Sequence, residues 1–424
     1  MKNYTKYKKA IEIGKEMLRS YVFKCFSRKK PQYFSKESKM SFKEIMLFIL
    51  NMPKKTLQVE LNNFFDTVLK RNKSITKQAY SEARQKIKPE AFIALNDGLL
   101  NRVIYEDINE YKVWNGYRLS AIDASVLELP NTEQLREDFG YVENLHTKTA
   151  KAMASCIYDI QNKFVIKSKI DRYGSSEREM AKALILEMKK EGEKQDLILF
   201  DRGYPSGEFV NFLIENKIDF VIRCQRNTFK AVSEAKKEDQ IVKLIYKDKA
   251  YAVRVLRFML SSAEEEVLIT SLLNEELSVN DFKKLYFYRW GIEVKYNELK
   301  NRLEIENFTG ATKTAIEQDF YASIYLSNMA ELARQESDEI VENNRNDKEN
   351  KHEYKTNMNV LIGTLKDKFV LMMLEKSTKK RNKMYESIME QVSKSVVPIR
   401  PERHNERSKS KSLQKYRTNR KRSL

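Results

Sequence analysis

The sequence predicts an α/β protein with a mixed sheet, flanked by N-terminal and C-terminal helical regions. Apolar residues recur at helical spacing before residue 105 and after residue 278. Between these limits, short apolar runs typical of strands alternate with helical stretches, which indicates an α/β layer. Only 11 glycines and 7 prolines occur in 424 residues, and this scarcity favours many helices and few loops.

Residues 1–110 are predicted to form a helical domain. Helical periodicity covers three stretches, 42–52, 57–71 and 74–92. The last of these is expected to be a basic helix that stops near Pro89, and its cations are Lys77, Arg84, Lys86 and Lys88. These cations fit a DNA-contacting face, with Arg84 as a candidate contact, or an ordinary solvated helix face.

Residues 111–340 are predicted to form the α/β domain. The expected strands are 117–129, 150–160, 163–171, 196–201 and 219–224. The expected helices between them are 176–191 and 205–217. Residues 228–275 do not continue the alternation and are predicted to be a β-rich insertion. Residues 341–395 are predicted to be helical again, and the basic stretch 396–424 is predicted to be a disordered tail.

Composition narrows the class of partner. The chain carries 79 basic and 60 acidic residues, a formal charge of +19, and such an excess suits a polyanion such as nucleic acid.

No apolar run approaches the roughly 18–20 residues that a membrane span needs, and no secretory signal is visible. Three widely spaced cysteines argue against a disulfide framework or zinc ribbon, so a reducing cytoplasm is expected.

Two aspartates occupy strand positions that are typical of functional sites. Asp123 lies inside the first expected strand, and Asp201 closes the apolar run 196–201 just before a turn. Sites in open α/β sheets form beyond the carboxyl ends of strands, which is where the sequence places Asp201. Alternatively, Asp201 caps the following turn and Asp123 is a buried acid whose hydrogen bonds are satisfied.

A stripe of polar residues is predicted along the helix expected at 285–303. At 100° per residue, its four members fall within about 60° of one another, beside an apolar seam: Tyr286, Arg289, Glu293 and Lys300. An Arg289–Glu293 ion pair is the ordinary explanation, but it accounts for only two of them. With Asp123 and Asp201, Glu293 makes three hard oxygen donors that suit Mg²⁺ and in-line displacement at phosphorus.

These motifs resemble those of bacterial insertion-sequence transposases of the DDE type. The signature Y-x2-R-x3-E-x6-K is met by the four residues of the stripe, "IDAS" surrounds Asp123, and "LFDRGY" surrounds Asp201. The similarity covers about 117–305, and residues 76–87 resemble the family's end-binding domain more weakly. The β-rich insertion between the second aspartate and the glutamate also fits this family.

The resemblance implies an RNase H-like catalytic core of the retroviral-integrase superfamily. It implies two Mg²⁺ ions, replaceable by Mn²⁺, on Asp123, Asp201 and Glu293. Tyr286, Arg289 and Lys300 would hold DNA phosphates. The expected activity is cut-and-paste movement of an element: binding of its terminal repeats, hydrolysis at the ends and joining of the 3′-hydroxyls to target DNA. The expected partners are double-stranded DNA and a second copy of the chain, in contact through 341–395. A bacterial, cytoplasmic and nucleoid-associated protein is expected.

One departure concerns base stacking. Relatives place a tryptophan in the β insertion against a flipped base, whereas the tryptophans here are Trp114 and Trp290. Phe258 or Tyr251 would have to replace it. Two alternatives to a competent transposase stay open: a catalytically silent, transposase-derived DNA-binding repressor, and a stand-alone metal-dependent nuclease.

Overall fold

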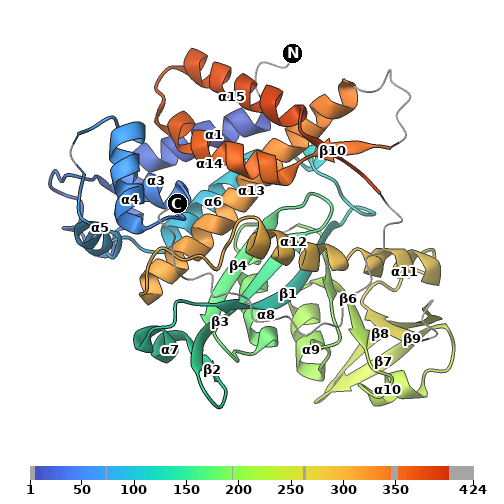
Figure 1. Cartoon of the computed structure of the whole chain (residues 1–424). Coiled ribbons are helices and arrows are strands. Elements are labelled where there is room, and N and C mark those ends of the chain that lie inside the picture. Colours follow the sequence, from blue (N-terminus) through green and yellow to red (C-terminus); the bar gives the residue numbers. More distant parts are fainter. Residues whose placement is uncertain (1–4, 73, 193, 261–263, 345–351, 401–424) are drawn as a thin grey trace. The chain divides into compact units, whose positions relative to one another are not determined.

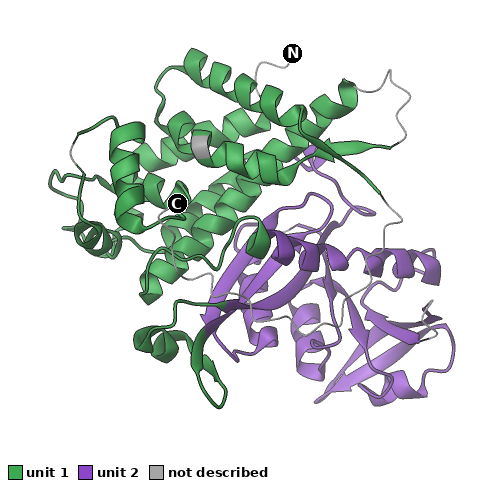
Figure 2. Cartoon of the chain, in the orientation of Figure 1, with its two compact units in different colours: residues 1–106, 128–150, 299–424 green, residues 107–127, 151–298 purple. Residues whose placement is uncertain are grey.

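The computed structural model describes residues 5–72, 74–192, 194–260, 264–344 and 352–400, so most of the predicted basic tail lies outside the described residues. The chain divides into two compact units (Figure 2). Unit 1 contains residues 1–106, 128–150 and 299–424, and unit 2 contains residues 107–127 and 151–298. These units cut across the predicted boundaries at 110 and 340, because N-terminal helices pack with helices after residue 312.

Unit 1 is mainly helical. Its N-terminal elements are α1 (Lys6–Arg19), α2 (Tyr21–Ser27), α3 (Phe42–Leu50), α4 (Leu57–Asn63), the π-helix Phe64–Val68, α5 (Lys77–Arg84), α6 (Glu90–Leu99) and the π-helix Leu100–Ile104. A short 3₁₀ turn, Ile108–Glu110, follows in the first residues of unit 2. The remaining elements of unit 1 are α7 (Glu133–Phe139), β2 (Tyr141–Glu143), α13 (Lys313–Asn343), β10 (Tyr354–Thr356), α14 (Met358–Leu374), α15 (Thr378–Ser393) and β11 (Val396–Pro398).

The helices of unit 1 form where the periodicity and the caps predict them. In α3, Ser41 and Glu44 form a capping box, and the apolar residues that follow are buried. The long helix α13 packs against α1, α3, α6, α14 and α15 (Figure 1). The core of unit 1 therefore joins the two ends of the chain.

Unit 2 contains the predicted α/β layer. Its strands are β1 (Arg118–Glu128), β3 (Lys148–Asp159), β4 (Val165–Arg172), β5 (Asp196–Phe200), β6 (Asp219–Cys224), β7 (Asp239–Tyr246), β8 (Lys249–Met259) and β9 (Glu265–Thr270). Its helices are α8 (Glu177–Lys189), α9 (Gly207–Glu215), α10 (Lys230–Glu234), α11 (Val279–Phe287) and α12 (Trp290–Asn301). The first residues of β3 and the last of α12 belong to unit 1.

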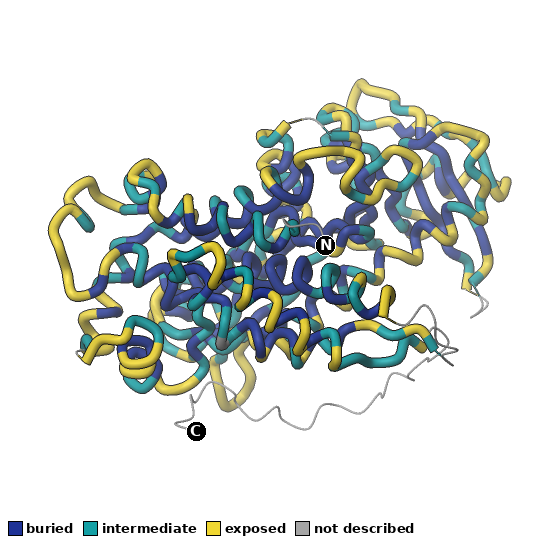
Figure 3. The backbone as a smooth tube through the Cα atoms, turned by 90° about the horizontal axis from the view of Figure 1, so that it is seen from above, coloured by how far each residue is buried: buried dark blue, intermediate teal, exposed yellow. Residues whose placement is uncertain are grey.

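The sheet is mixed, as predicted. Its order is β3-β1-β5-β6-β9-β8-β7, β4 pairs with the outer side of β3, and β2 pairs with the first residues of β3. The pairs β1–β5 and β5–β6 are parallel, whereas β6–β9, β9–β8 and β8–β7 are antiparallel. All five residues of β5 are buried, which explains its uninterrupted apolar sequence. Buried residues line the strands and the inner faces of the helices, while exposed residues mark the connecting loops (Figure 3).

Residues 228–275 are β-rich, as expected, and they extend the main sheet. Strand β9 pairs with β6 over Val221–Cys224 and Val267–Thr270, and β8 and β7 follow in hairpin order. The segment therefore shares hydrogen bonds with the strands that precede it in the chain.

The predicted single helix at 285–303 is two helices. Helix α11 ends at Phe287 and α12 begins at Trp290, with a turn at Tyr288 and Arg289. The break contains no proline, so the periodicity alone gave no sign of it. The predicted apolar seam is nevertheless present, because Leu285, Ile292 and Leu299 are buried.

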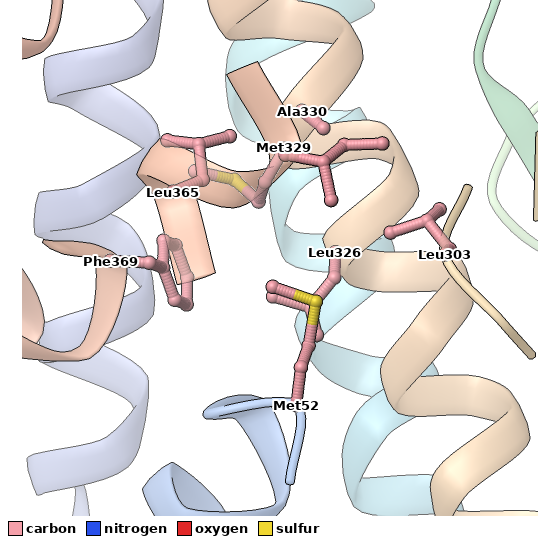
Figure 4. A pocket seen from close by; sticks show the side chains of 8 residues that line it. Met52, Leu303, Leu326, Met329, Ala330, Leu365 and Phe369 are labelled. Atoms are coloured by element: carbon pink, nitrogen blue, oxygen red, sulfur yellow. The ribbon is translucent and has the colours of Figure 1, made fainter. Parts of the chain in front are cut away.

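A small apolar cavity lies within the helices of unit 1. It has a volume of about 10 Å³ and is lined by Met52, Leu303, Leu326, Met329, Ala330, Ile362, Leu365 and Phe369 (Figure 4). A void of this size holds at most one water molecule, and its lining offers no polar partner. It is a packing gap between helices. Across the described residues, no helix has the length and apolar character needed to cross a membrane.

Candidate functional site

Asp123 and Asp201 lie side by side at one edge of the sheet in unit 2. The parallel strands β1 and β5 pair from Arg118 with Asp196 through to Ala121 with Leu199. Continued by two residues, this register sets Asp123 beside Asp201. Neighbouring strands lie about 4.8 Å apart, so both carboxylates occupy one place on the sheet.

A buried ion pair fixes that register. The Arg118 guanidinium donates to both Asp196 oxygens, Nε to Oδ1 at 2.6 Å and Nη2 to Oδ2 at 3.0 Å, at the first paired position of the two strands. Two-point geometry of this kind is specific, and a buried pair would be left with an uncompensated charge if the strands slipped. The aspartate pair therefore depends on an ion pair at the opposite ends of the same strands.

The Asp201 side chain also shapes the turn that follows β5. Its Oδ1 accepts a hydrogen bond of 2.8 Å from the backbone N–H of Gly203. The turn-capping role considered for Asp201 is thus real, and it leaves Oδ2 as a further oxygen of the same carboxylate. Capping and site formation are compatible here, because the cap holds the carboxylate at the strand end.

Asp123 is half-buried in a setting that disfavours its charge. Burial is the main cause that raises the pKa of its carboxyl to about 6, and repulsion from Asp201 and Glu177 acts in the same direction. The N–H of Ala124, 2.9 Å from Oδ1, and the Arg289 cation oppose that shift. A carboxylate pair that raises the pKa of one member is a common property of functional sites.

A third carboxylate near the pair was not predicted from the sequence. Glu177 is the first residue of α8, after the Ser176 cap, and burial followed by repulsion from Asp201 raises the pKa of its carboxyl. A methyl group placed on Gly203 would lie 3.1 Å from Asp201 Oδ1 and 3.8 Å from Glu177 Oε2. The two carboxylates therefore lie around one small space. The sequence signalled only a helix start here.

The hydroxyl group of Tyr204 is buried at the same place without a hydrogen-bond partner among the described residues. Burial raises the pKa of this phenol, and Asp123, Glu177 and Asp201 add to that rise electrostatically. The ring is held against Phe200 and Phe209, with centroids 5.2 and 5.7 Å away. A buried hydroxyl group without a partner is rare and is often explained by a water molecule or ion.

Glu293 forms an ion pair with Arg289, which the sequence analysis gave as the ordinary explanation for these two residues of the polar stripe. Arg289 Nη2 lies 3.0 Å from Glu293 Oε1, and the glutamate side chain is 38% exposed while the arginine side chain is 7% exposed. Arg289 also lies over the rings of Trp290 and Tyr286, and its Nε has no hydrogen-bond partner among the described residues. The Arg289 cation also acts electrostatically on Asp123.

Two tyrosines anchor the helix pair to the strands that carry the aspartates. Tyr286 Oη donates to the carbonyl of Phe200 at 3.2 Å. Tyr296 Oη lies 3.0 Å from the carbonyl of Asp123 and 3.1 Å from that of Ala154. Tyr286 was expected to contact a phosphate, but its hydroxyl group is buried and engaged with the backbone of β5.

Arg84 is an interior residue of unit 1, so the structure corrects its predicted role as a DNA contact. Its side chain is 1% exposed and its partners are Gln318, Thr309, the carbonyl of Ala315, and Asp319 at 2.8 Å. The helix periodicity identified its helix correctly but could not show these partners, which lie more than 220 residues away. Lys300, by contrast, is a half-buried residue in the last turn of α12.

The predicted replacements for a stacking tryptophan are engaged in the protein. Phe258 is buried beneath Lys283, and the Tyr251 hydroxyl group is hydrogen-bonded to Asn211. Exposed aromatic side chains occur instead around the helix break, at Phe287, Tyr288 and Trp290.

The acidic residues fit a divalent cation by their chemistry. Carboxylate oxygens are the ligands that Mg²⁺ prefers, and the unpartnered Tyr204 hydroxyl group supplies a donor beside them. Within the described ranges, however, no three His, Cys, Asp or Glu side chains are arranged closely enough to hold a metal ion. Asp123 and Asp201 lie together, whereas Glu293 is paired with Arg289.

Comparison with known proteins identifies the class. The family model described as "Transposase DDE domain" matches residues 114–329, just over half of the chain and the region that contains both aspartates and Glu293. The chain therefore belongs to the DDE-domain transposase family. No curated protein matches it.

Among solved structures, the chain is similar to one described as the cryo-EM structure of piggyBac transposase synaptic complex with hairpin DNA. The identity is 11%, the TM-score is 0.43, and the match covers 95% of this chain and 88% of that one. A similarity at this level does not establish a shared fold.

Proposed function

We propose that this chain moves an insertion sequence by cutting both DNA ends of the element and joining their 3′-hydroxyls to a target. The observation that carries the proposal is the parallel pairing of β1 with β5, whose register, continued by two residues, sets Asp123 beside Asp201 within the matched family domain. The proposed core is RNase H-like, and the proposed host is a bacterium in which the protein works on nucleoid DNA.

The proposed cation site consists of Asp123, Asp201 and Glu293. Two Mg²⁺ ions, or Mn²⁺ in their place, would supply activation of the attacking oxygen and stabilisation of the leaving oxygen at phosphorus. The residues of the chain do the positioning: the Arg118–Asp196 pair sets the strand register, Gly203 N–H holds Asp201, and Tyr296 holds the backbone of Asp123.

The proposed phosphate contacts are Lys300 and Arg289. Lys300 stands seven residues, about two turns, after Glu293 on α12, so a DNA strand along this helix would meet both. Arg289 reaches a phosphate only by turning away from Glu293. Two copies of the chain would hold two ends together, and residues 341–395 remain the proposed contact. The net charge of +19 supports a DNA partner.

The test is cleavage of a labelled duplex that carries the terminal repeat of the chain's own element, with Mg²⁺ or with EDTA. Wild type is compared with Asp201→Asn, Glu293→Gln and the control Glu187→Gln, an exposed acid on α8. We expect cleavage at the element boundary by wild type and the control, and binding without cleavage by the other two. If all four bind the duplex and none cuts it with Mg²⁺ or Mn²⁺, the chain is a DNA-binding repressor. Cleavage without joining to a target would indicate a nuclease.

A further inference from the structure

We propose that unit 1 carries a binding surface for the phosphate backbone of a DNA duplex, formed by the lysine cluster Lys29, Lys30, Lys86 and Lys88. The inference rests on the proposed function, because DNA is the partner proposed there. It goes further by naming a surface of unit 1 that contacts DNA without regard to base sequence, whereas Glu293 and the aspartates belong to unit 2.

The backbone of unit 1 brings the members of the lysine cluster together. The loop that follows α2 forms a short antiparallel bridge with the segment between α5 and α6, in which Arg28 pairs with Ile87. The Lys29 N–H donates across this bridge to the carbonyl of Lys86 at 2.9 Å. Side chains alternate along extended backbone and Ile87 is fully buried, so Lys86 and Lys88 lie on the opposite, outer face. The register also sets Lys29 opposite Lys86.

Aromatic rings hold three of the four ammonium groups. Lys30 and Lys86 share the ring of Tyr33, with Nζ atoms 5.9 and 5.8 Å from its centroid. Lys88 lies 5.9 Å from the centroid of Phe26, which is 49% exposed. Such contacts place a cation over a ring without neutralising its charge. The rings therefore position the ammonium groups and leave them able to bind an anion.

The positive charge of the lysine cluster is not balanced. None of its four members forms an ion pair within the described ranges, and Lys29 Nζ instead donates to Thr314 Oγ1 at 2.8 Å. Other cations of unit 1, such as Arg71 and Arg102, are paired with carboxylates. Like charges that face each other across paired strands, as Lys29 and Lys86 do, repel. A row of phosphates would relieve this repulsion and release counterions.

The loop after α2 is fixed by contacts within unit 1. Phe34 has a φ of 59°, a left-handed conformation that a phenylalanine rarely adopts, and its ring packs edge-on against Phe42 with centroids 5.6 Å apart. Arg28 Nη1 donates to the carbonyl of Tyr33 at 3.3 Å. Strained backbone of this kind persists only where its surroundings hold it, and it is concentrated at binding sites. Less conformational entropy is then lost when a ligand binds.

A DNA duplex is favoured over an anionic lipid surface as the partner of the lysine cluster. The chain belongs to a transposase family, and three of the four lysines already cover the neighbouring rings, so charge is the main contact that the cluster offers. The sequence predicted Lys86 and Lys88 together with Arg84 as cations of a DNA-contacting face. The structure moves that face from α5 to the bridge between the two segments.

The experiment measures binding of a fluorescein-labelled DNA duplex of arbitrary sequence to the full chain in EDTA, by fluorescence anisotropy at several salt concentrations. Phosphate contacts carry no sequence information, so an arbitrary duplex is a sufficient probe. For the double variant Lys30→Gln with Lys86→Gln, we expect the slope of log K against log salt concentration to become shallower by about 2, since each phosphate contact contributes about 0.9. Affinity at about 0.1 M salt should fall roughly tenfold.

The matched control is the double variant Lys55→Gln with Lys70→Gln. Both of these lysines are exposed in unit 1 and lie outside the lysine cluster. The control removes the same charge and should keep the wild-type slope and affinity. Circular dichroism and thermal melting check that each variant is folded.

The outcomes that would overturn the inference differ from a failure of the proposed function. If the folded variant of Lys30 and Lys86 binds the duplex like wild type, the lysine cluster is no DNA contact and the proposed function stands. If both double variants flatten the slope equally, the effect is one of net charge and the inference is wrong. If wild type binds phosphatidylserine vesicles and no DNA, the inference and the proposed DNA partner fail together. A chain that binds DNA through the cluster but never cuts it overturns only the proposed function.

Discussion

The hydroxyl group of Tyr286 donates a hydrogen bond of 3.2 Å to the carbonyl of Phe200, the residue immediately before Asp201. Tyr286, the first residue of the polar stripe predicted from the sequence, therefore contacts the strand end that precedes Asp201. Its hydroxyl group is 86 residues from its acceptor in sequence, and the contact is buried. A role in holding the strand end thus competes with the phosphate contact that the signature suggested.

Replacing Tyr286 with phenylalanine separates these roles. We expect Tyr286→Phe to lower the free energy of unfolding by about 1 kcal/mol, because one buried hydrogen bond is lost. Urea denaturation measures it. The control is Tyr288→Phe, two residues further along and exposed, which should leave stability unchanged. If Tyr286→Phe has wild-type stability but binds DNA more weakly, the result would support a contact between the Tyr286 hydroxyl group and a DNA phosphate.

Arg84 is predicted to stabilise the fold of unit 1 through its buried ion pair with Asp319. Arg84→Ala leaves Asp319 buried without its cation, so we expect a loss of about 3–5 kcal/mol in the free energy of unfolding. Lys77→Ala, on the exposed side of the same helix, should cost almost nothing. Both variants remove one positive charge, so equal effects of the two on stability would contradict the buried role of Arg84.

Tyr204→Phe should stabilise the protein in EDTA. The variant removes a buried hydroxyl group that lacks a partner, so we expect a gain of about 1 kcal/mol in the free energy of unfolding. Chemical denaturation with and without Mg²⁺ measures it, and the gain should shrink when Mg²⁺ is present. A loss of stability in EDTA would mean that the hydroxyl group already has a partner in the metal-free protein.

Glu336 predicts a pH dependence of stability in unit 1. Burial is the largest cause that raises the pKa of this carboxyl above 4.5, against hydrogen bonds from Tyr385 and from the N–H of Tyr7. The folded state therefore holds a proton more tightly than the unfolded state. As the pH rises through and above the usual pKa of 4.5, folding requires either proton uptake or a buried charge, so stability falls.

The variant Glu336→Gln removes this titration. Its free energy of unfolding should rise relative to wild type between about pH 4 and about pH 7. Parallel urea titrations across that range give the difference, which cancels the other titrating groups. Glu342→Gln, exposed on the same helix, serves as the control and should follow wild type at every pH. A constant difference between Glu336→Gln and wild type would show that Glu336 is not perturbed.

The sequence predicted the features that depend on local pattern. Strand periodicity located β1, β3, β4, β5 and β6, and the helices predicted at 176–191 and 205–217 are α8 and α9. The apolar run before Asp201 was correctly predicted to be a strand, and all five residues of that strand are buried. From these elements the sequence placed Asp123 inside a strand and Asp201 at a strand end, which is where the structure has them.

Features that depend on contacts between residues far apart in the chain could not be predicted from the sequence. Glu177 is an ordinary first-turn acid until Gly203 and Asp201 are brought beside it. The helix break at Tyr288 and Arg289 means that the angular positions calculated for one continuous helix at 285–303 do not hold. Arg289 and Glu293 are nevertheless one turn apart and form an ion pair. Arg84 occupied the predicted helix but faced partners contributed by α13 and the residues just before it. Each of these depends on tertiary packing rather than on the local pattern.

The contact between Arg84 and Asp319 also bears on how the chain folds during synthesis. The two residues are 235 positions apart, so the ribosome must add all of unit 2 before the partner of Arg84 emerges. At about 5–20 residues per second, that interval lasts on the order of tens of seconds. Throughout it, the N-terminal helices carry an unpaired cation and an uncovered apolar face. The nascent N-terminal region should therefore be a chaperone substrate until α13 has been translated.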